Sequence, residues 1–319
     1  MDQIDLKKAH IQFVNYLQST CMLSPKTVEN HEKAFELLLR RFPELTSNML
    51  DEDHLTEFFA WLQTRRRMVG RGMSAAGIKK GTVATYWRRL NRFFGWLCMR
   101  RIIAQNPLRA EGMRCPKVYY EDKQFLERPQ MERIMGAISF GIRWKNNLVR
   151  TRNLALISTA ANCGLRRGEL LALRVAAVDL VKNELTVEGA TSKSRSTRTI
   201  PLNSRAREDI ESYLKERRAS GYATPYLWVS DREDRALAVD GMRRIVALIG
   251  AKAGVKFHLH QLRHTFAVNF LHNTGVNSFK LQRLLGHRSI VSTAIYTRCL
   301  PVRGVRADLE RLSDLTNTL

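Results

Sequence analysis

The sequence predicts a mainly α-helical protein with two domains: an all-α domain, followed by a larger α+β domain that contains a short antiparallel sheet. Its 319 residues, 44% of them hydrophobic, exceed what one compact core usually organises. Apolar residues recur at helical spacing over most of the chain, and strand-type alternation appears near residue 190. Both patterns lapse between Asn106 and Leu126. We therefore expect domains at 1–112 and 125–319, joined by a linker at 113–124.

The first domain is expected to consist of helices. Asp5–Thr20 carries apolar residues at helical spacing. Ser24 followed by Pro25 is a favourable start for a second helix, because serine caps a helix N-terminus and proline suits its first turn. Asp51–Arg66 predicts a third helix. After a basic, glycine-containing loop, Thr82–Arg101 predicts a fourth, whose aromatic residues we assign to the core.

The chain is strongly basic. Lys and Arg number 53 against 30 Asp and Glu, which gives a formal net charge of +23 and a pI near 10.4. An excess of this size along the whole chain favours a polyanionic partner, and nucleic acid is the first choice. Phosphate contacts in the first domain are expected from the following residues: Lys79, Lys80, Arg88, Arg89 and Arg92.

Other classes of protein are disfavoured. No uninterrupted apolar segment is long enough to span a bilayer, and the N-terminus has no signal-peptide pattern, so we expect no membrane association. The loop before Thr82 is not a Walker A motif, because Ile78 rather than lysine follows Gly77. The five cysteines are widely spaced without a CxxC pair, which favours reduced thiols in a cytoplasmic protein.

The second domain begins with helices at Arg128–Ser139 and Val149–Asn162. The alternating stretches Glu184–Gly189 and Thr197–Leu202 predict a β-hairpin around a turn rich in Ser, Lys and Arg. Helices are expected from there to the end. Neither internal repeats nor low-complexity segments are evident in the sequence.

Two segments of this domain carry polar residues early in its sequence. In GLRRGELLALR, Gly164 ends a helix, and Arg166 lies three residues before Glu169, close enough to pair with it. Alone, this is an ordinary surface ion pair of little energetic value. The hairpin turn places Lys193 between two strands, where it could swing over a substrate. Alone, this is an ordinary solvated lysine.

A third segment, HLHQLRHTF, places His260 and Arg263 one helical turn apart, so both side chains point to the same side. His260 and His264 have a spacing that zinc ligands also use. However, the segment supplies no third ligand, and Arg263 would repel a cation. We therefore predict no metal site.

The fourth segment, LLGHRSIVSTAIYTR, holds His287 and Tyr296 nine residues apart, on opposite faces of any unbroken helix. Gly286 is suited to end the first helix, which leaves His287 in a turn. Ser289 or Ser292 can cap a new helix that carries Tyr296. The chain can therefore break between the two residues, and their side chains can converge.

Together these segments supply two arginines, a lysine, two histidines and a tyrosine, without an acidic cluster for Mg²⁺. Two guanidiniums can clamp a phosphodiester and stabilise the charge of a pentacoordinate transition state. Tyrosine can attack phosphorus and carry it covalently. Lysine and histidine can move the protons. The set predicts phosphoryl transfer to tyrosine without a metal or other cofactor.

The four segments resemble the motifs of the tyrosine recombinase (phage integrase) family. GLRRGE resembles the family's first arginine box, HQLRH its HxxR box, and LLGH followed by Tyr296 its third box. Lys193, eight residues before Pro201, matches the family's β-hairpin lysine. The resemblance runs from about Phe125 to Thr297 in the family's order, and the helical region before it resembles the core-site-binding domain.

The resemblance implies a role for each matched residue. Arg166 and Arg263 would clamp the phosphate, with Glu169 orienting Arg166. His287 would hydrogen-bond the scissile phosphate, and Tyr296 would attack it to give a 3′-phosphotyrosine and a free 5′-hydroxyl.

Proton transfer would fall to two further residues. Lys193 would act as general acid, although Arg195 and Arg198 are close enough in sequence to leave this assignment open. His260 would assist the transfer of the tyrosine proton.

The family also implies a homotetramer on two DNA sites, with possible accessory proteins, and Arg303–Leu315 is a candidate for a C-terminal helix that docks on a neighbouring subunit. We expect a site-specific recombinase for integration or excision of a mobile element or phage. The alternatives are Xer-type resolution of chromosome or plasmid dimers, a type IB topoisomerase, and a non-catalytic DNA-binding regulator on the same fold.

Overall fold

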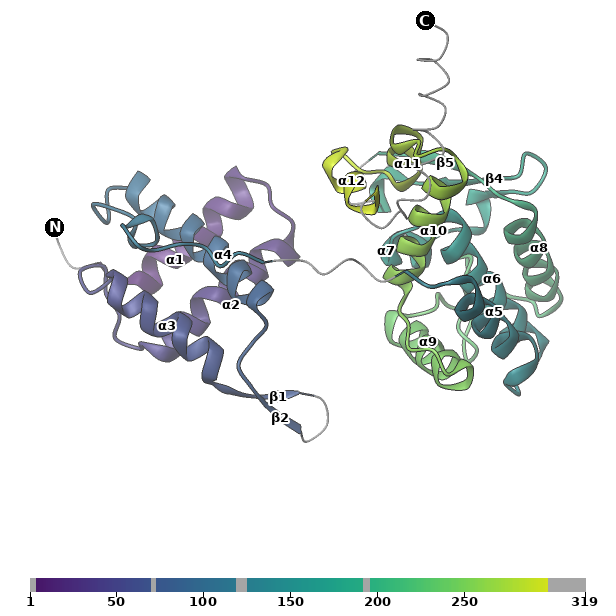
Figure 1. The fold of residues 1–319 in the computed structure, drawn as a ribbon, viewed down its shortest axis with the longest axis horizontal. Helices are drawn as coiled ribbons and strands as arrows, with labels where there is room; N and C mark the ends of the chain where they lie inside the picture. Colours follow the sequence, from purple (N-terminus) through teal and green to yellow (C-terminus); the bar gives the residue numbers. More distant parts are fainter. Residues whose placement is uncertain (1–3, 70–72, 119–124, 192–195, 298–319) are drawn as a thin grey trace, which may run out of the picture. The chain divides into compact units, whose positions relative to one another are not determined.

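The computed structural model describes residues 4–69, 73–118, 125–191 and 196–297. The chain divides into two compact units, Met1–Tyr120 and Glu121–Leu319, which we call the N-terminal and C-terminal units (Figure 1). In the described part of the chain, no helix combines the length and apolar character needed to cross a bilayer.

The predicted helices of the N-terminal unit are present. Side chains cap three of them: Asp5, Asp51 and the predicted cap Ser24 accept hydrogen bonds from backbone N–H groups in the first turns. The first helix continues into a π-helical turn, Tyr16–Thr20, and a 3₁₀ turn, Pro107–Arg109, follows the last. The helices are α1 (Leu6–Asn15), α2 (Pro25–Arg41), α3 (Glu52–Thr64) and α4 (Lys80–Met99).

The core of this unit is aromatic, as predicted for α4. Phe93 and Phe94 are fully buried, and the ring of His10 stacks on Phe35 with centroids 3.9 Å apart. Burial lowers the pKa of His10 and of His31 to about 4, so both imidazoles are neutral at neutral pH.

A short antiparallel pair, β1 (Arg66–Val69) and β2 (Met73–Ala76), replaces the loop that the sequence predicted before α4. Neither strand has a run of β-branched residues, so little in the sequence predicts this pair. Gly77 directly follows β2, and this position requires glycine. The φ of Gly77 is +68°, and a Cβ atom there would lie 2.2 Å from the Gln63 carbonyl oxygen.

The C-terminal unit is a helical body with a small sheet on one side. The sheet contains β3 (Val178–Asp179), β4 (Glu184–Val187) and β5 (Arg198–Pro201) in that order, all antiparallel, within the described residues. The predicted hairpin β4–β5 is confirmed, with Leu185 opposite Ile200. The two-residue strand β3 was not predicted, because it is too short to show alternation.

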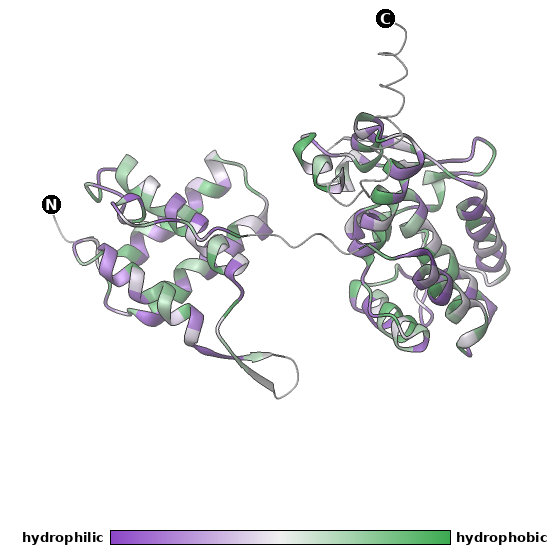
Figure 2. Ribbon diagram, viewed as in Figure 1, coloured by the Kyte–Doolittle hydropathy of each residue, from purple (hydrophilic) through white to green (hydrophobic). Residues whose placement is uncertain are grey.

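Helix α6 (Asn147–Cys163) runs through the middle of this unit, between α8 (Ser204–Ala219) and α10 (Leu259–Asn273). Its residues are buried on most sides, which explains why it lacks an amphipathic pattern. Most other helices show separate hydrophobic and hydrophilic faces (Figure 2). The remaining α-helices of this unit are α5 (Arg128–Gly136), α7 (Arg167–Ala172), α9 (Val239–Ala253), α11 (Ser278–Leu285) and α12 (Val291–Thr297).

Candidate active site

The site begins where α6 ends. Gly164 has a left-handed φ of +60°, and a Cβ atom there would lie 2.3 Å from the ring of Phe266. Only glycine fits this turn. The Gly164 carbonyl accepts a hydrogen bond from Arg263 Nη1 at 2.7 Å, and Arg166 follows as the residue that precedes α7. The turn thus brings together two arginines that are almost one hundred positions apart in sequence.

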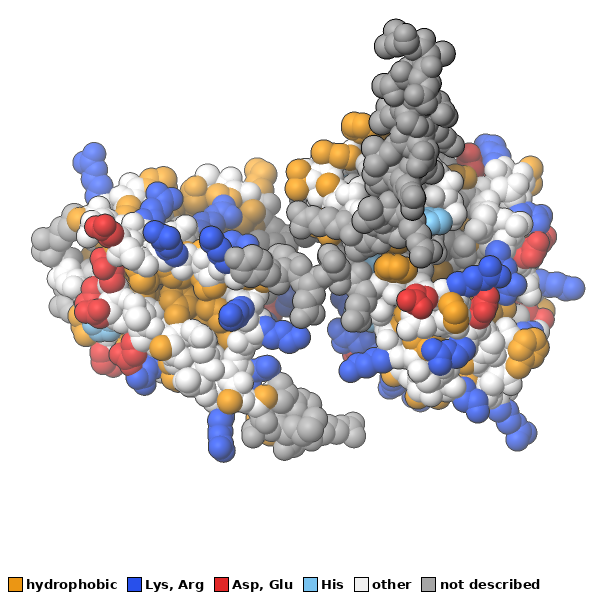
Figure 3. All heavy atoms as spheres, in the orientation of Figure 1, with side chains coloured by type: hydrophobic (Ala, Val, Ile, Leu, Met, Phe, Trp, Pro, Cys, Tyr) orange, Lys and Arg blue, Asp and Glu red, His pale blue; other side chains and the backbone are white. Residues whose placement is uncertain are grey.

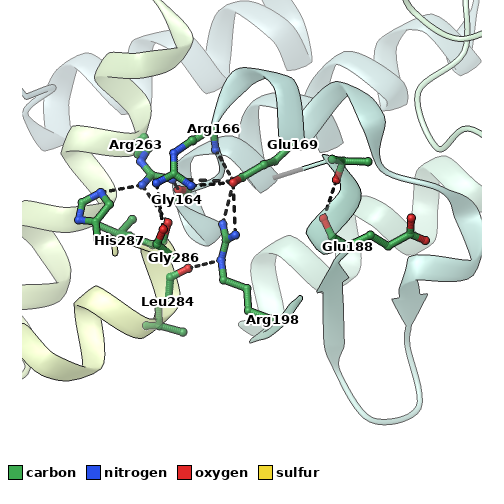
Figure 4. A network of polar contacts seen from close by, with 11 residues as sticks. Gly164, Arg166, Glu169, Glu188, Arg198, Arg263, Leu284, Gly286 and His287 are labelled. Atoms are coloured by element: carbon green, nitrogen blue, oxygen red, sulfur yellow. Dashed lines mark hydrogen bonds and ion pairs between the residues drawn. The ribbon is translucent and has the colours of Figure 1, made fainter. Parts of the chain in front are cut away.

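Glu169 is the centre of the polar network in Figure 4. Its side chain is buried and accepts hydrogen bonds from Arg166 Nη1 at 2.8 Å and from the Arg166 backbone N–H at 2.9 Å. Arg198 Nη2 donates to the same carboxylate at 2.7 Å, and Arg263 Nη1 lies 3.9 Å away. The predicted pairing of Arg166 with Glu169 is therefore confirmed.

The charge state of Glu169 follows from these contacts. Burial alone would raise the pKa of Glu169, but hydrogen bonds and charge from Arg198 and Arg166 outweigh burial and lower it to about 2. The carboxylate is thus ionised at neutral pH and holds several guanidiniums in one orientation.

Arg263 is 1% exposed and connects three parts of the site. Besides Gly164, its guanidinium donates to the Leu285 carbonyl at 3.0 Å and lies 2.9 Å from His287 Nε2. Burial and the nearby Arg166 charge lower the pKa of Arg263 to about 10, which leaves it protonated at neutral pH. Arg166 Nη2 donates to the Gly286 carbonyl at 3.0 Å, so the two arginines bind adjacent carbonyls where α11 ends.

The predicted break between His287 and Tyr296 is confirmed. Helix α11 ends before Gly286, whose φ is +63°, and α12 begins at Val291. The Ser289 hydroxyl accepts a hydrogen bond from the Val291 N–H at 3.3 Å, so Ser289 rather than Ser292 occupies the start of the new helix. The rings of His287 and Tyr296 are nearly parallel, with centroids 6.3 Å apart.

Tyr296 is 2% exposed, and its hydroxyl lies 3.2 Å from Nδ1 of His264. His264 is also buried, and the ring of the exposed His260 packs edge-on against it with centroids 4.4 Å apart. The family resemblance assigns proton transfer to His260, whereas the spacing of His264 suggests only a zinc ligand, which we do not predict. Helical spacing fails to identify His264, because its partner lies on another helix.

Lys193 and Arg195 lie outside the described residues. Arg198, beyond the turn on β5, bonds to Glu169 and donates from Nε to the Leu284 carbonyl at 2.8 Å. It therefore ties the hairpin to the end of α11. The sequence contained a signal for this contact: Arg198 lies two residues before the buried Ile200 on β5, so the two side chains share the inward face and Arg198 requires a buried partner.

The DNA-contact residues predicted in the N-terminal unit occupy two places on α4. Lys79 and Lys80 are exposed at its start, and Arg88 and Arg92 are exposed one turn apart along its side. Arg89 is half-buried, and its guanidinium lies 5.8 Å from the centre of the Tyr86 ring.

The C-terminal unit has further basic residues next to the site. A cleft of about 1050 Å³ adjoins it, and its lining includes Arg198, Lys280, Arg283, His287 and Arg288. Within the described residues, no group of three or more His, Cys, Asp or Glu side chains is arranged to hold a metal ion. What the site offers chemically is a set of oriented cations beside a phenol and two imidazoles, which suits a phosphate group.

A profile of the phage integrase family matches residues 124–301, which is more than half of the chain. The chain belongs to the phage integrase family of tyrosine recombinases. This recombinase is 26% identical to tyrosine recombinase XerC of Proteus mirabilis over 290 residues, covering 89% of this chain and 87% of the relative. It is 29% identical to XerC of Vibrio vulnificus over 301 residues, covering 92% and 87%.

Solved structures share its fold. The integrase of transposon Tn1549 in complex with a circular intermediate DNA has a TM-score of 0.73 at 19% identity, covering 96% of this chain and 98% of that one. XerH in a post-cleavage complex with a palindromic difH substrate has a TM-score of 0.67 at 20% identity, covering 92% and 84%. These similarities confirm the predicted fold class.

Proposed function

We propose that this tyrosine recombinase cuts and rejoins specific sites in double-stranded DNA through a 3′-phosphotyrosine. One observation carries the proposal. Arg166 and Arg263 converge on the turn that holds His287, and the Tyr296 ring packs 6.3 Å from that imidazole. A phosphodiester bound by the two guanidiniums would meet a phenol as nucleophile.

The reaction consists of two matched transesterifications. The Tyr296 oxygen attacks phosphorus, the bond from phosphorus to the 5′ oxygen breaks, and Lys193 supplies the proton that the departing oxygen takes. Arg166, Arg263 and His287 stabilise the charge on the non-bridging oxygens. A 5′-hydroxyl from the partner DNA then attacks the phosphotyrosine and reverses these steps. One phosphoester is exchanged for another, so the exchange requires no nucleotide hydrolysis.

The basic surface of the protein and its similarity to DNA-bound structures both support DNA as the partner. Lys and Arg side chains are spread over the face of both units seen in Figure 3, where Asp and Glu are fewer. The Tn1549 integrase and XerH structures contain DNA. In this proposal, Lys79, Lys80, Arg88, Arg89 and Arg92 contact DNA phosphates, and four copies of the chain assemble on two DNA sites, with accessory proteins where the system requires them.

The proposed chemistry could serve either of two biological roles. Our sequence-based expectation is integration or excision of a mobile element or phage, and the similarity to the Tn1549 transposon integrase fold agrees with it. The curated relatives are XerC recombinases that match about nine-tenths of the chain, which favours Xer-type dimer resolution. The two roles differ in where the target sites lie.

Covalent capture tests both the chemistry and the role. Lightly nicked, sheared genomic DNA from the host would be incubated with the protein, because a nick near the cut releases a short fragment and traps the phosphotyrosine. Adducts would be precipitated with detergent and sequenced. We expect wild-type adducts at a small number of loci and none with Tyr296→Phe, while both proteins bind DNA equally.

The position of the captured sites decides the role. Adducts at the two ends of an inserted element indicate integration and excision, whereas adducts at one chromosomal or plasmid locus indicate dimer resolution. An undiminished adduct with Tyr296→Phe would refute the proposed nucleophile. DNA binding without any adduct would instead identify a non-catalytic regulator.

A further inference from the structure

The hydroxyl of Tyr296 meets an imidazole that the sequence motifs did not assign. His264 Nδ1 lies 3.2 Å from the hydroxyl oxygen, within hydrogen-bond distance. Both residues are nearly inaccessible, at 4% and 2% exposure. Solvent therefore has little access to this pair, and a base that takes the phenol proton must come mainly from the protein.

The pair is held from both sides. His264 is on α10, immediately after Arg263, and Tyr296 is on α12, which packs against α10. His260 packs edge-on against His264, with an interplanar angle of 74°. On the other side of the phenol, the His287 ring is nearly parallel to it, at 8°. The contact is thus part of the packed site rather than a chance encounter of surface residues.

The charges around the phenol favour its ionisation. A phenolate at Tyr296 would raise the pKa of Arg263, so by reciprocity the Arg263 cation stabilises the phenolate. A second cation formed on His264 after proton transfer would be adjacent to the same negative oxygen. The phenolate that forms is therefore stabilised electrostatically by Arg263.

We propose that His264 is a catalytic residue that accepts the proton of Tyr296 during strand cleavage. This inference rests on the proposed function, because it takes Tyr296 as the nucleophile. The neutral imidazole carries its proton on Nε2, and Tyr296 donates its hydrogen bond to Nδ1. As the phenol oxygen bonds to phosphorus, its proton moves to Nδ1 and His264 becomes an imidazolium.

The protons of the leaving and attacking oxygens are also accounted for. The 5′ oxygen leaves with the electron pair of the broken bond and takes its proton from Lys193. When a 5′-hydroxyl later attacks the phosphotyrosine, His264 returns its proton to the phenol oxygen and Lys193 recovers one from the attacking hydroxyl. In this proposal His260, which the family resemblance assigns to assist the transfer, acts through His264: it packs edge-on against that ring and keeps it in position.

The test compares two substitutions of His264. His264→Asn retains an acceptor near the Nδ1 position but cannot take a proton, and His264→Phe retains the ring volume without either nitrogen. Single-turnover cleavage of a nicked duplex carrying a captured site should slow about 100-fold or more in both, since proton-transfer catalysis contributes on that scale. His272→Asn, on the exposed last turn of α10, is the matched control and should cleave at the wild-type rate.

A rescue experiment separates proton transfer from structural support. Replacing Tyr296 with 3-fluorotyrosine lowers the pKa of the phenol and reduces its need for a base. We expect this replacement to restore much of the His264→Asn rate and to change the wild-type rate little. Failure of the fluorinated residue to relieve the defect would overturn the proposal, as would His264→Asn cleavage within threefold of wild type or faster.

A measurement on the protein alone keeps the proposal testable if either variant misfolds. With ¹⁵N-histidine labelling, the His264 Nδ1 signal of the wild-type protein should report an unprotonated acceptor, and Tyr296→Phe should shift it. A protonated Nδ1, or an unshifted signal, would overturn the inference while leaving covalent capture intact. Lack of any wild-type adduct would instead overturn the proposed function and the transfer step with it.

Discussion

Glu169 is a buried carboxylate that contacts Arg166 and Arg198 and lies 3.9 Å from Arg263. Burying a charge costs free energy unless partners compensate it, and here the partners are the side chains that the site must orient. Removing the negative charge would leave guanidiniums facing one another in a confined space. Stability and geometry at this site therefore depend on the same residue.

We expect Glu169→Gln to reduce the free energy of unfolding of the C-terminal unit by about 3–5 kcal/mol, the usual cost of breaking a buried ion pair. Covalent capture should fall with it, because Arg166 loses its orientation. Urea unfolding measures the first effect. Glu184→Gln, at an exposed carboxylate on β4, is the control and should change the free energy by less than about 0.5 kcal/mol.

The same substitution has a consequence for acid stability. Folding lowers the pKa of Glu169 from 4.5 to about 2, so its contribution is complete above pH 4.5 and is lost as the pH falls towards 2. The Gln variant should lack this part of the acid sensitivity. An identical loss of stability between pH 4.5 and 2 in both proteins would contradict the assigned role of the carboxylate.

Single residues also show where sequence reasoning reached its limit. Arg166, Arg263, His287 and Tyr296 could be grouped because their spacing and chemistry matched one reaction. His264 could not be added to this group from the sequence. Its contact with Tyr296 depends on how α12 packs against α10, and the spacing of residues along one helix does not predict packing between helices. The inward orientation of Arg198 could have been predicted, since strand alternation places its side chain on the buried face of β5.

At the scale of elements, glycines and helix caps made the site's turns predictable. Gly164 and Gly286 both adopt a left-handed conformation at helix ends, where the sequence placed them. The strands were less predictable: β4 and β5, of four residues each, alternate clearly, whereas β1, β2 and β3, of two to four residues each, show little periodicity. The β1–β2 pair is held by tertiary contacts such as the close approach of Gly77 to α3.

We expect Gly164→Ala to destabilise the junction of α6 and α7 by about 2–5 kcal/mol, the sum of a left-handed alanine and overpacking against Phe266 and Leu285. It should also reduce covalent capture, because the Gly164 carbonyl positions Arg263. Gly254→Ala is a matched control: its φ is +62°, but nothing lies within 4 Å of the added Cβ. That variant should lose only about 1–2 kcal/mol and retain capture. Equal losses in both would show that packing at Gly164 is unimportant.

For the whole molecule, charge is the property that the sequence predicts most directly. The formal net charge is +23, and between Glu57 and Glu111 there are twelve Lys and Arg but no Asp or Glu. A stretch of one sign that includes α4 agrees with phosphate contacts from that helix. Affinity for DNA should therefore be strongly salt-dependent, because each neutralised phosphate releases a counterion.

Salt dependence tests whether this face of α4 meets DNA. Each phosphate contact contributes about 0.9 to the slope of log affinity against log salt, so Arg88→Gln with Arg92→Gln should reduce that slope by about 2. The loss should be similar for a captured site and for a random duplex of equal length, since phosphate contacts are independent of sequence. Arg207→Gln is the control, because Glu211 already compensates Arg207 at 3.3 Å on α8. An unchanged slope in the double variant would mean that DNA lies against another surface, since exposed arginines one turn apart that touched phosphates could not be removed without this effect.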